Sequence, residues 1–322
     1  MKHLTTFVAR ATVAATIAVL ATSAHAQLEL KIMAPAGPGG GWDTAARSLQ
    51  QVMTTTGVAK SVQVTNVTGA GGTVGLAQFV NGAKGDGNQL MVNGITMVGA
   101  ILTSKSPVNL DMVTPIARLT GDPLVIVVPA NSPHKSVQDL AAAVKADVAK
   151  VTWAGGSAGG ADHILAALFV KAAGADQAKV NYIAFSGGGE AIAAIVGGKV
   201  TAGISGYGEF EGQIKAGKMR ALAVSSGKRL EGADVPTLKE QGMDVELMNW
   251  RSIVAPPGIT PEQRKTLADA IEKTVKSKEW AEVLKVKGWE DYYLPGDQFA
   301  AFLKAEQVRV GDVLKSIGLV KS

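Results

Sequence analysis

Four glycine-rich loops constrain this chain most, because each lies between an apolar run typical of a β-strand and a segment with helical periodicity. Two loops lie in the first half of the chain, at 35–43 and 66–72, and two in the second, at 155–160 and 186–189. Glycine at such a junction leaves backbone N–H groups accessible, and the following helix adds partial positive charge at its N-terminus. For any single loop, a tight turn is an equally good interpretation. Together the two pairs predict two lobes that face one anionic ligand.

The first 26 residues have the features of a secretory signal. Lys2 and Arg10 precede the apolar run 11–21, and Ala24-His25-Ala26 is a small-x-small cleavage site. The apolar run is about half of the ~20 residues that a membrane span needs. We therefore expect cleavage after Ala26 and secretion into the periplasm. The sequence has no Cys, which excludes disulfides and a lipid anchor on an N-terminal Cys.

Composition limits the partners of the remaining chain, which is long enough for about two domains. Its net charge falls from +5 to +3 when Lys2 and Arg10 are removed with the signal, and it has no run of Lys or Arg. Only 5% of the residues are aromatic, which leaves little for stacking on bases. We therefore expect no nucleic-acid partner.

Strand-like and helix-like segments alternate along the chain. Strand signals at 28–32, 62–64 and 90–92 are separated by helical spacing, and the pattern starts again at Val151. The β-branched run Val125 to Val128 predicts a strand buried on both faces. This alternation predicts an α/β fold with mostly parallel sheets flanked by helices.

The expected lobes are discontinuous along the chain. We expect the chain to cross between them near 118–123 and again near 225–229. Lobe 1 would then comprise 27–122 plus 226–322, and lobe 2 would comprise 123–225.

Enzyme motifs fit this sequence poorly. Neither of the first two loops meets the G-x-G-x-x-G pattern, and no P-loop occurs. The segment 203–207 resembles a nucleophile elbow, but Tyr207 replaces the closing glycine. Beyond the predicted signal, only His134 and His163 remain as possible bases, and no cluster has metal-ligand spacing. We expect no catalysis, metal or cofactor, and an enzyme on a similar fold is the alternative.

Several polar residues near the loops have two interpretations. Asp43 is expected to be the N-cap of the first helix rather than a ligand contact. Asn66 either binds the ligand or holds its turn. Arg47 and Arg251 are the best side-chain partners for a carboxylate, because Arg offers a bidentate fork, but a solvated or interlobe role is the alternative.

A set of motifs in fixed order resembles the substrate-binding proteins of tripartite tricarboxylate transporters, often called the Bug family. The motifs are Pro38-Gly39-Gly40-x-x-Asp43, Asn66-x-x-Gly69-Ala70-Gly71-Gly72-x-x-Gly75, Asp86-Gly87, 216–224, Val235-Pro236-Thr237-Leu238-x-Glu240-x-Gly242 and 250–257. One departure is Gly41-Trp42, where many relatives carry smaller or hydroxyl residues. This departure bears on the identity of the ligand.

The resemblance implies a two-lobed periplasmic binding protein of type II, or Venus flytrap, that is monomeric and not catalytic. It would deliver a small di- or tricarboxylate to the membrane permease subunits of the transporter, or present it to a sensor. Backbone amides, helix N-termini and waters would hold the carboxylate. The implied ligand-binding residues are Gly39, Gly40, Gly41, Trp42, Asp43, Asn66, Ala70, Gly71, Gly72, Thr96, Met97, Gly156, Ser157, Ala158, Gly159, Gly160, Ser186, Gly187, Gly188, Ser205, Gly206 and Tyr207.

Overall fold

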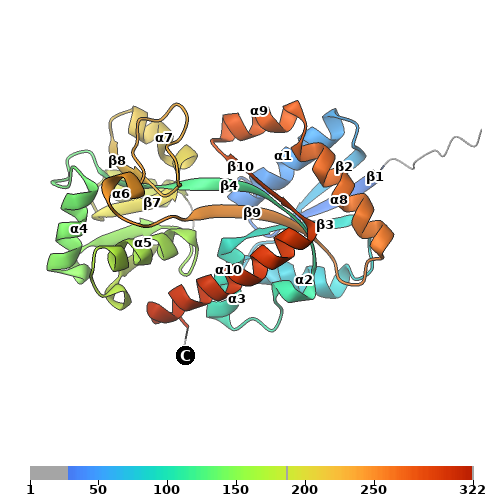
Figure 1. The fold of residues 1–322 in the computed structure, drawn as a ribbon, viewed down its shortest axis with the longest axis horizontal. Coiled ribbons are helices and arrows are strands. Elements are labelled where there is room, and N and C mark those ends of the chain that lie inside the picture. Colours follow the sequence, from blue (N-terminus) through green and yellow to red (C-terminus); the bar gives the residue numbers. More distant parts are fainter. Residues whose placement is uncertain (1–27, 186–187, 321–322) are drawn as a thin grey trace, which may run out of the picture.

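Strands that are far apart in the sequence form one curled sheet in the computed structural model, which describes residues 28–185 and 188–320 (Figure 1). The sheet order is β2-β1-β3-β9-β4-β7-β5-β6, and β8 and β10 both pair with β4. The strands of the described chain are β1 Leu28–Ala34, β2 Ala59–Asn66, β3 Gln89–Gly94, β4 Thr114–Pro129, β5 Thr152–Gly155, β6 Asn181–Ala184, β7 Ala202–Gly206, β8 Met219–Val224, β9 Met248–Ala255 and β10 Glu290–Pro295. The predicted signal peptide lies outside the described residues.

Helices flank this sheet on both sides. Those of the described chain are α1 Gly41–Thr55, α2 Thr73–Gly82, α3 Ile95–Ser104, α4 Val137–Ala146, α5 Ala161–Ala172, α6 Gly188–Val196, α7 Tyr207–Lys215, α8 Pro261–Val275, α9 Lys278–Lys287 and α10 Gly296–Ser316. Local sequence explains several of their starts. Thr260 and Gln263 form a capping box at α8, with Pro261 as the first helical residue. None of the helices in the described part of the chain is both long and apolar enough to cross a membrane.

Figure 1 shows the elements in two groups. We call β1–β3, β10, α1–α3, α8 and α9 the first half, and β5–β8 and α4–α7 the second half. Strands β4 and β9 run between the halves, and α10 crosses both. The pairs β1–β2, β1–β3, β5–β6 and β5–β7 are parallel, as the strand-helix-strand alternation predicts. The α/β class and the flytrap type of fold are confirmed.

The expectation of mostly parallel strands was wrong for the strands that join the halves. β4 is 16 residues long, and it pairs with β9 and β10 in the first half and with β7 and β8 in the second. All four of these pairings are antiparallel, as is β3–β9. The reason is topological, because β9 carries the chain back along β4 to the first half. The sheets are therefore mixed.

The second crossing between the halves also differs from expectation. The segment 226–247 was expected in lobe 1, but its backbone pairs with β8: Val224 N–H donates to Pro236 O, and Leu238 N–H donates to Val224 O. Gln241 also receives a hydrogen bond from Gln138 on α4. The chain returns to the first half only with β9, after residue 247. The segment has little periodicity, so the sequence did not indicate which half it covers.

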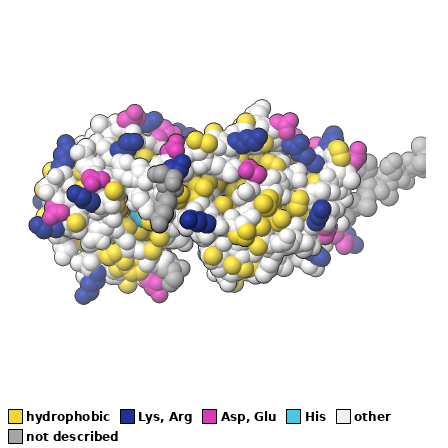
Figure 2. All heavy atoms as spheres, turned by 90° about the horizontal axis from the view of Figure 1, so that it is seen from below, with side chains coloured by type: hydrophobic (Ala, Val, Ile, Leu, Met, Phe, Trp, Pro, Cys, Tyr) yellow, Lys and Arg dark blue, Asp and Glu magenta, His cyan; other side chains and the backbone are white. Residues whose placement is uncertain are grey.

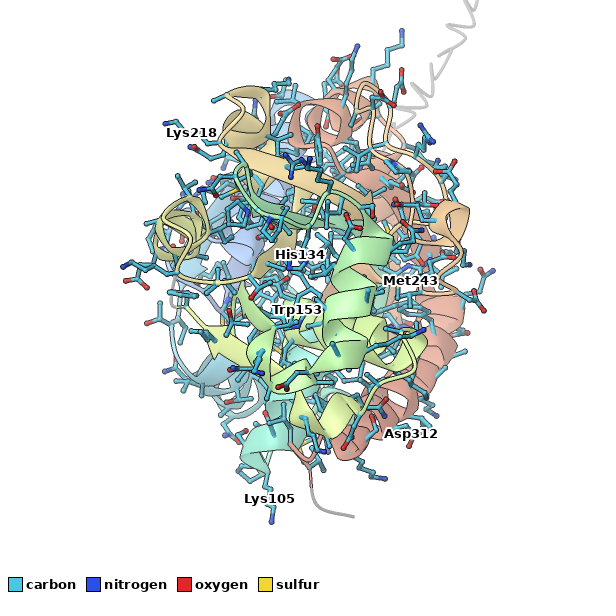
Figure 3. The ribbon with its side chains drawn as sticks, turned by 90° about the vertical axis from the view of Figure 1, so that its left-hand side faces the viewer. Lys105, His134, Trp153, Lys218, Met243 and Asp312 are labelled. Atoms are coloured by element: carbon cyan, nitrogen blue, oxygen red, sulfur yellow. The ribbon has the colours of Figure 1, made fainter. Side chains whose placement is uncertain are left out.

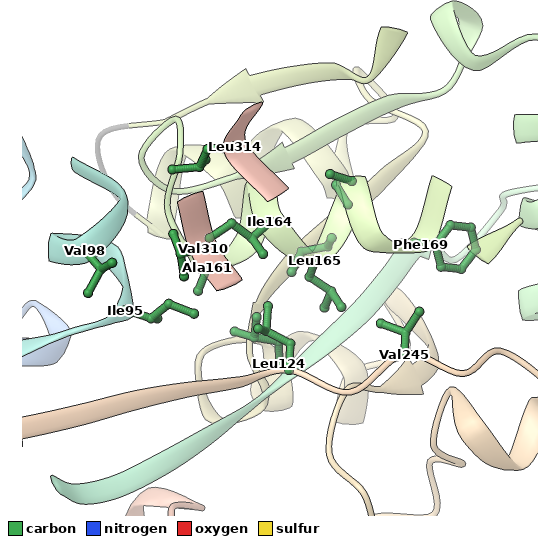
Figure 4. Packing of buried hydrophobic residues seen from close by; sticks show 14 of the residues in the cluster. Ile95, Val98, Leu124, Ala161, Ile164, Leu165, Phe169, Val245, Val310 and Leu314 are labelled. Carbon is green, nitrogen blue, oxygen red and sulfur yellow. The ribbon is translucent and has the colours of Figure 1, made fainter. Parts of the chain in front are cut away.

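The hydrophobic core is shared by the two halves (Figure 4). One cluster joins α3, α5, α10 and β4, and it includes Ile95, Val98, Leu124, Ala161, Ile164, Leu165, Phe169, Val245, Val310 and Leu314. Strand β4 contributes alternate residues to two clusters: Ile126 packs here, whereas Val125 and Val127 pack under α6 and α7. Both faces of this strand are buried, as its β-branched run predicts.

Charged side chains of both signs are interspersed on the face in Figure 2, and yellow hydrophobic side chains gather mainly on the half at the right. This face has no continuous basic surface of the kind that binds nucleic acid. Figure 3 shows the second half end-on, with Trp153 inside it. Trp153 is fully buried, and its ring packs edge-to-face on that of Phe169, with the ring centroids 5.3 Å apart.

Candidate functional site

A cavity of about 260 Å³ lies between the halves. Residues from both halves and from β9 line it: Ala36, Gly41, Trp42, Thr96, Gly155, Gly156, Ser157, Gly160, Ala161, Asp162, Phe185, Ala191, Ile204, Ser205, Gly206, Glu209, Asn249 and Arg251. Its volume is below the roughly 300–1,000 Å³ of pockets for drug-sized ligands. The cavity therefore suits a small molecule.

Four helices begin at this cavity. Gly41 is the first residue of α1, Thr96 lies in the first turn of α3, Ala161 begins α5, and Gly206 is the N-cap of α7. The first N–H groups of a helix have no partner within the helix, and the helix dipole places partial positive charge there. Four such ends directed at one small space attract an anion without a dedicated cationic side chain.

Asp43 is not the N-cap of α1, as was expected. Gly40 is the N-cap, and Asp43 lies three residues into the helix with only 2% of its surface exposed. Its carboxylate accepts hydrogen bonds from Gly39 N–H at 2.8 Å, Asn66 Nδ2 at 2.8 Å and Arg47 Nε at 2.9 Å. Burial alone would raise the pKa of Asp43, but these hydrogen bonds outweigh it and the pKa is lowered. Asp43 thus fixes the loop before α1 and does not line the cavity.

Asn66 and Arg47 form further hydrogen bonds near the loop before α1. Asn66 Nδ2 also donates to Ala36 O at 3.0 Å, and Arg47 Nη2 donates to Asn66 Oδ1 at 3.3 Å. Of the two interpretations of Asn66, the structure favours the one in which it holds its turn. Arg47 is half-exposed and is not among the residues that line the cavity.

Gly72, in the loop 69–72, lies against the side chain of Trp42. A Cβ on Gly72 would lie 2.7 Å from Trp42 Cζ3 and 2.7 Å from Met97 Cε, and Gly72 has φ +92°. Only glycine fits this conformation and this contact. Gly72 therefore packs against Trp42, and Trp42 itself lines the cavity.

The loop 155–160 approaches the cavity from the second half. Gly156 N–H donates to Asp162 Oδ2 at 2.7 Å, and Gly159 N–H donates to His163 Nδ1 at 3.2 Å. His163 stacks on Tyr182 with ring centroids 4.2 Å apart. Burial lowers the pKa of His163 to about 4, so the ring is neutral near pH 7. His163 orders this loop and does not line the cavity.

His134, the second possible base, lies in the turn before α4 (Figure 3). Its N–H donates to Ser132 Oγ, and its carbonyl accepts from Arg220 Nη1. It is not among the residues that line the cavity. Within residues 28–185 and 188–320, no cluster of three or more His, Asp or Glu could hold a metal ion.

A buried ion pair links the two halves beneath the cavity. Arg251 Nη2 on β9 lies 2.9 Å from Asp122 Oδ2 on β4, and both side chains are less than 10% exposed. A Cβ on Gly41 would lie 2.7 Å from Arg251 Nη2, and one on Gly206 would lie 2.7 Å from Asp122 Oδ2. The pair therefore connects the start of α1 with the start of α7. Arg251 thus lies between the halves and also lines the cavity, so the structure is consistent with both interpretations.

Two acidic residues on the cavity lining, Asp162 on α5 and Glu209 on α7, were missed by the sequence reasoning. Burial, followed by the nearby carboxylates of Glu209 and Asp122, raises the pKa of Asp162 to about 7, against the lowering effect of the hydrogen bond from Gly156 N–H. Glu209 Oε2 accepts from Ser205 Oγ at 2.6 Å. The position of Asp162, two residues after a glycine loop, was the available signal.

The residues proposed from sequence divide into three sets. Those on the cavity lining are Gly41, Trp42, Thr96, Gly156, Ser157, Gly160, Ser205 and Gly206. Those that do not line it are Gly39, Gly40, Asp43, Asn66, Ala70, Gly71, Gly72, Met97, Ala158, Gly159 and Tyr207, and Gly188 begins α6. Tyr207 is the first residue of α7, is 8% exposed, and packs in the cluster that contains Val125 and Phe210. Ser186 and Gly187 lie outside the described residues.

Comparisons with known proteins agree with this geometry. Residues 45–319 match the family described as tripartite tricarboxylate transporter family receptor. Protein BugT of Bordetella pertussis is 28% identical, over 97% of this chain and 95% of its own. A TctC solute binding protein from Polaromonas is 26% identical with a TM-score of 0.72, over 90% of this chain and 99% of its own.

A further solved relative carries a ligand. MatC from Rhodopseudomonas palustris with bound malate is 25% identical with a TM-score of 0.74, over 89% of this chain and 98% of its own.

Proposed function

The chain belongs to the family of tripartite tricarboxylate transporter receptors, and on this premise we propose that its cavity captures a small di- or tricarboxylate for a membrane permease. The family is one of solute-binding receptors. One observation carries the proposal: four helix N-termini begin at one small cavity between two α/β halves. Malate in the related MatC is a carboxylate of suitable size.

The ligand-binding residues we propose are those of the predicted set that line the cavity. At the first half, Gly41, Trp42 and Thr96 present the N-termini of α1 and α3. At the second half, Gly156, Ser157, Gly160, Ser205 and Gly206 present those of α5 and α7. Of the other predicted residues, Asp43 and Asn66 hold the loop before α1, and Gly159 is hydrogen-bonded to His163 in the loop before α5.

We further propose that the halves are lobes that close on the ligand. The contacts of 226–247 with β8 favour lobe 1 as 28–122 plus 248–320 and lobe 2 as 123–247. The connections are β4 and β9, which the Arg251–Asp122 pair joins. The protein would act as a monomer in the periplasm after cleavage at Ala26, without catalysis, and two permease subunits would receive the ligand.

A thermal-shift screen of the chain from residue 27 tests the proposal. Malate, citrate and succinate are compared with malonamide and glucose, which have the polar groups without the charge. A carboxylate at 100 times its dissociation constant should stabilise the fold by about 2.7 kcal/mol. The proposal is wrong if only the neutral compounds raise the melting temperature.

A pair of glycine variants tests the location of the site. Gly41→Ala places a methyl group 2.7 Å from Arg251 Nη2 at the cavity, whereas a Cβ on Gly212 in α7 meets nothing within 4 Å. We expect Gly41→Ala to weaken carboxylate binding about tenfold or more, as the loss of one charge-assisted hydrogen bond would. Gly212→Ala should bind as the parent does. Equal affinity of both folded variants would remove the α1 loop from the site.

A further inference from the structure

The charges on the cavity lining are not those of a simple anion site. The charged residues among its described lining are Asp162, Glu209 and Arg251. Arg251 is already paired with Asp122 at 2.9 Å. Its positive charge is therefore offset, and the carboxylates of Asp162 and Glu209 leave the lining with an acidic excess.

The acidic excess lies on one side of the cavity. Asp162 is in the first turn of α5 and Glu209 in the first turn of α7, both in the second half. Asp162 already accepts the N–H of Gly156, and Glu209 accepts the hydroxyl of Ser205. Each carboxylate therefore offsets part of the positive charge of its own helix N-terminus. These two helix ends attract a ligand carboxylate less than their geometry alone suggests.

The opposite side of the cavity keeps its attraction for anions. The first turn of α3 has no acidic residue, and Thr96 lines the cavity there. The acidic residue in the first turn of α1 is Asp43, which is paired with Arg47 and does not line the cavity. Arg251 lies beneath Gly41, and its buried Nη1 has no hydrogen-bond partner in the described structure. An anionic group placed here meets two helix N-termini, with the guanidinium group of Arg251 on the cavity lining.

The ionised form of Asp162 has no positive partner among the described residues. Its pKa is raised to about 7, firstly by burial, against the hydrogen bond from Gly156 N–H, and also by Glu209 and Asp122. Ionising a partly buried carboxyl group close to two others is costly, and either a proton or a nearby cation relieves this cost. Arg251, the cation of the lining, is held by Asp122.

From this polarity, and resting on the function proposed above, we infer that the ligand is a small amino acid whose carboxylate lies at α1 and α3 and whose ammonium group faces Asp162 and Glu209. A plain dicarboxylate of the same length would place a second negative charge against these two residues. The volume of about 260 Å³ suits a compound of this size. The amine thus distinguishes this cavity from a generic carboxylate site.

Matched ligands that differ only by an amine test this inference. Calorimetry at pH 7.5 compares succinate with L-aspartate, glutarate with L-glutamate, and butyrate with 4-aminobutyrate. We expect the amine-bearing member of at least one pair to bind roughly 10- to 100-fold tighter, the range of a hydrogen bond to a charged group. If amine-free acids bind equally or more tightly, the inference fails and the proposed function stands. If no carboxylate of any kind binds, both fail.

Two variants of one helix test the role of Glu209. Glu209→Gln removes a carboxylate from the cavity, and Glu211→Gln removes one from the same helix that is paired with Lys215 and does not line the cavity. The net charge changes equally in both. We expect Glu209→Gln to lower the preference for the amine about tenfold or more and Glu211→Gln to leave it unchanged. The inference fails if the parent, Glu209→Gln and Glu211→Gln all show the same preference for the amine-bearing ligand. Asp162→Asn is a second test variant, and we expect it to lower this preference as Glu209→Gln does.

Discussion

At Gly99 the two halves approach each other closely, so replacing this glycine tests the packing between them. Gly99 lies in α3, and a Cβ there would be 2.0 Å from the backbone oxygen of Gly159 in the loop before α5. Gly159 has little freedom to move, because its N–H donates to His163 Nδ1 and its φ is +77°. Gly99→Ala therefore forces α3 and this loop apart.

The magnitude follows from two opposing effects. Alanine in the middle of a helix is about 1 kcal/mol better than glycine. Overpacking typically costs about 1–3 kcal/mol, and we expect the upper end here because the blocking atom belongs to the backbone. The net effect of Gly99→Ala should be a loss of roughly 2 kcal/mol.

Gly311→Ala is the matched control. Gly311 is also a buried helical glycine, in α10, but a Cβ there meets only Leu102 Cδ1 at 3.7 Å, an ordinary contact. This variant should be neutral or more stable by up to about 1 kcal/mol. Since each kcal/mol shifts the melting temperature of a large domain by about 2–4 °C, Gly99→Ala should melt roughly 5–10 °C below Gly311→Ala.

Urea unfolding and calorimetric binding complete the measurement. Because α3 and α5 both begin at the cavity, separating them should also weaken carboxylate binding by about tenfold or more, the equivalent of 1.4 kcal/mol. If Gly99→Ala matches Gly311→Ala in stability and in affinity, the close approach of the halves does not contribute to the folded or the bound state.

The other predictions concern buried charges. Arg251→Met should destabilise the fold by about 3–5 kcal/mol because it leaves Asp122 buried without a partner, and adding Asp122→Asn should restore part of the loss in urea unfolding. Additive effects of these two changes would contradict the pairing. Asp43→Asn should cost about 1.5–3 kcal/mol near pH 7 and little below the folded pKa, because a lowered pKa stabilises only the ionised form. His163 is buried in its neutral form, and its pKa is lowered to about 4. Its contribution to the free energy of unfolding is therefore lost as the pH falls from 6.5 towards 4. In urea unfolding as a function of pH, His163→Gln should remove up to about 3 kcal/mol of this loss.

Local sequence patterns predicted the elements that depend on local interactions. The capping box of Thr260 and Gln263 marks the start of α8, and the β-branched run 125–128 marks a strand buried on both faces. Both signals arise from residues within a few positions of one another. The family motifs extended this to the fold, because their order along the chain is specific.

Long-range pairing explains what the sequence did not predict. Asp43 has the residue type of an N-cap and lies near the start of a helix. It is instead the third residue of α1, where its buried carboxylate accepts hydrogen bonds from Arg47 and Asn66. The antiparallel pairing of β4 with β9 joins residues more than 120 positions apart. No local pattern reports such a partner.

The candidate site was predicted at the level of loops rather than of side chains. Glycine-rich junctions indicated where helix N-termini meet the cavity, as they do at Gly41 and Gly160. The same signal occurs at Gly72, where the glycine instead makes room for Trp42. A glycine in the sequence indicates that another group approaches the backbone closely, but it does not indicate whether that group is a ligand or a side chain.

A crystal structure of the chain from residue 27 with L-aspartate and, separately, with malate would locate the ligand directly. We expect one ligand in the cavity between the halves, with a carboxylate within hydrogen-bond distance of N–H groups at the starts of α1 and α3, near Gly41 and Thr96. A ligand bound outside this cavity, or a carboxylate turned away from both helix N-termini, would contradict this expectation.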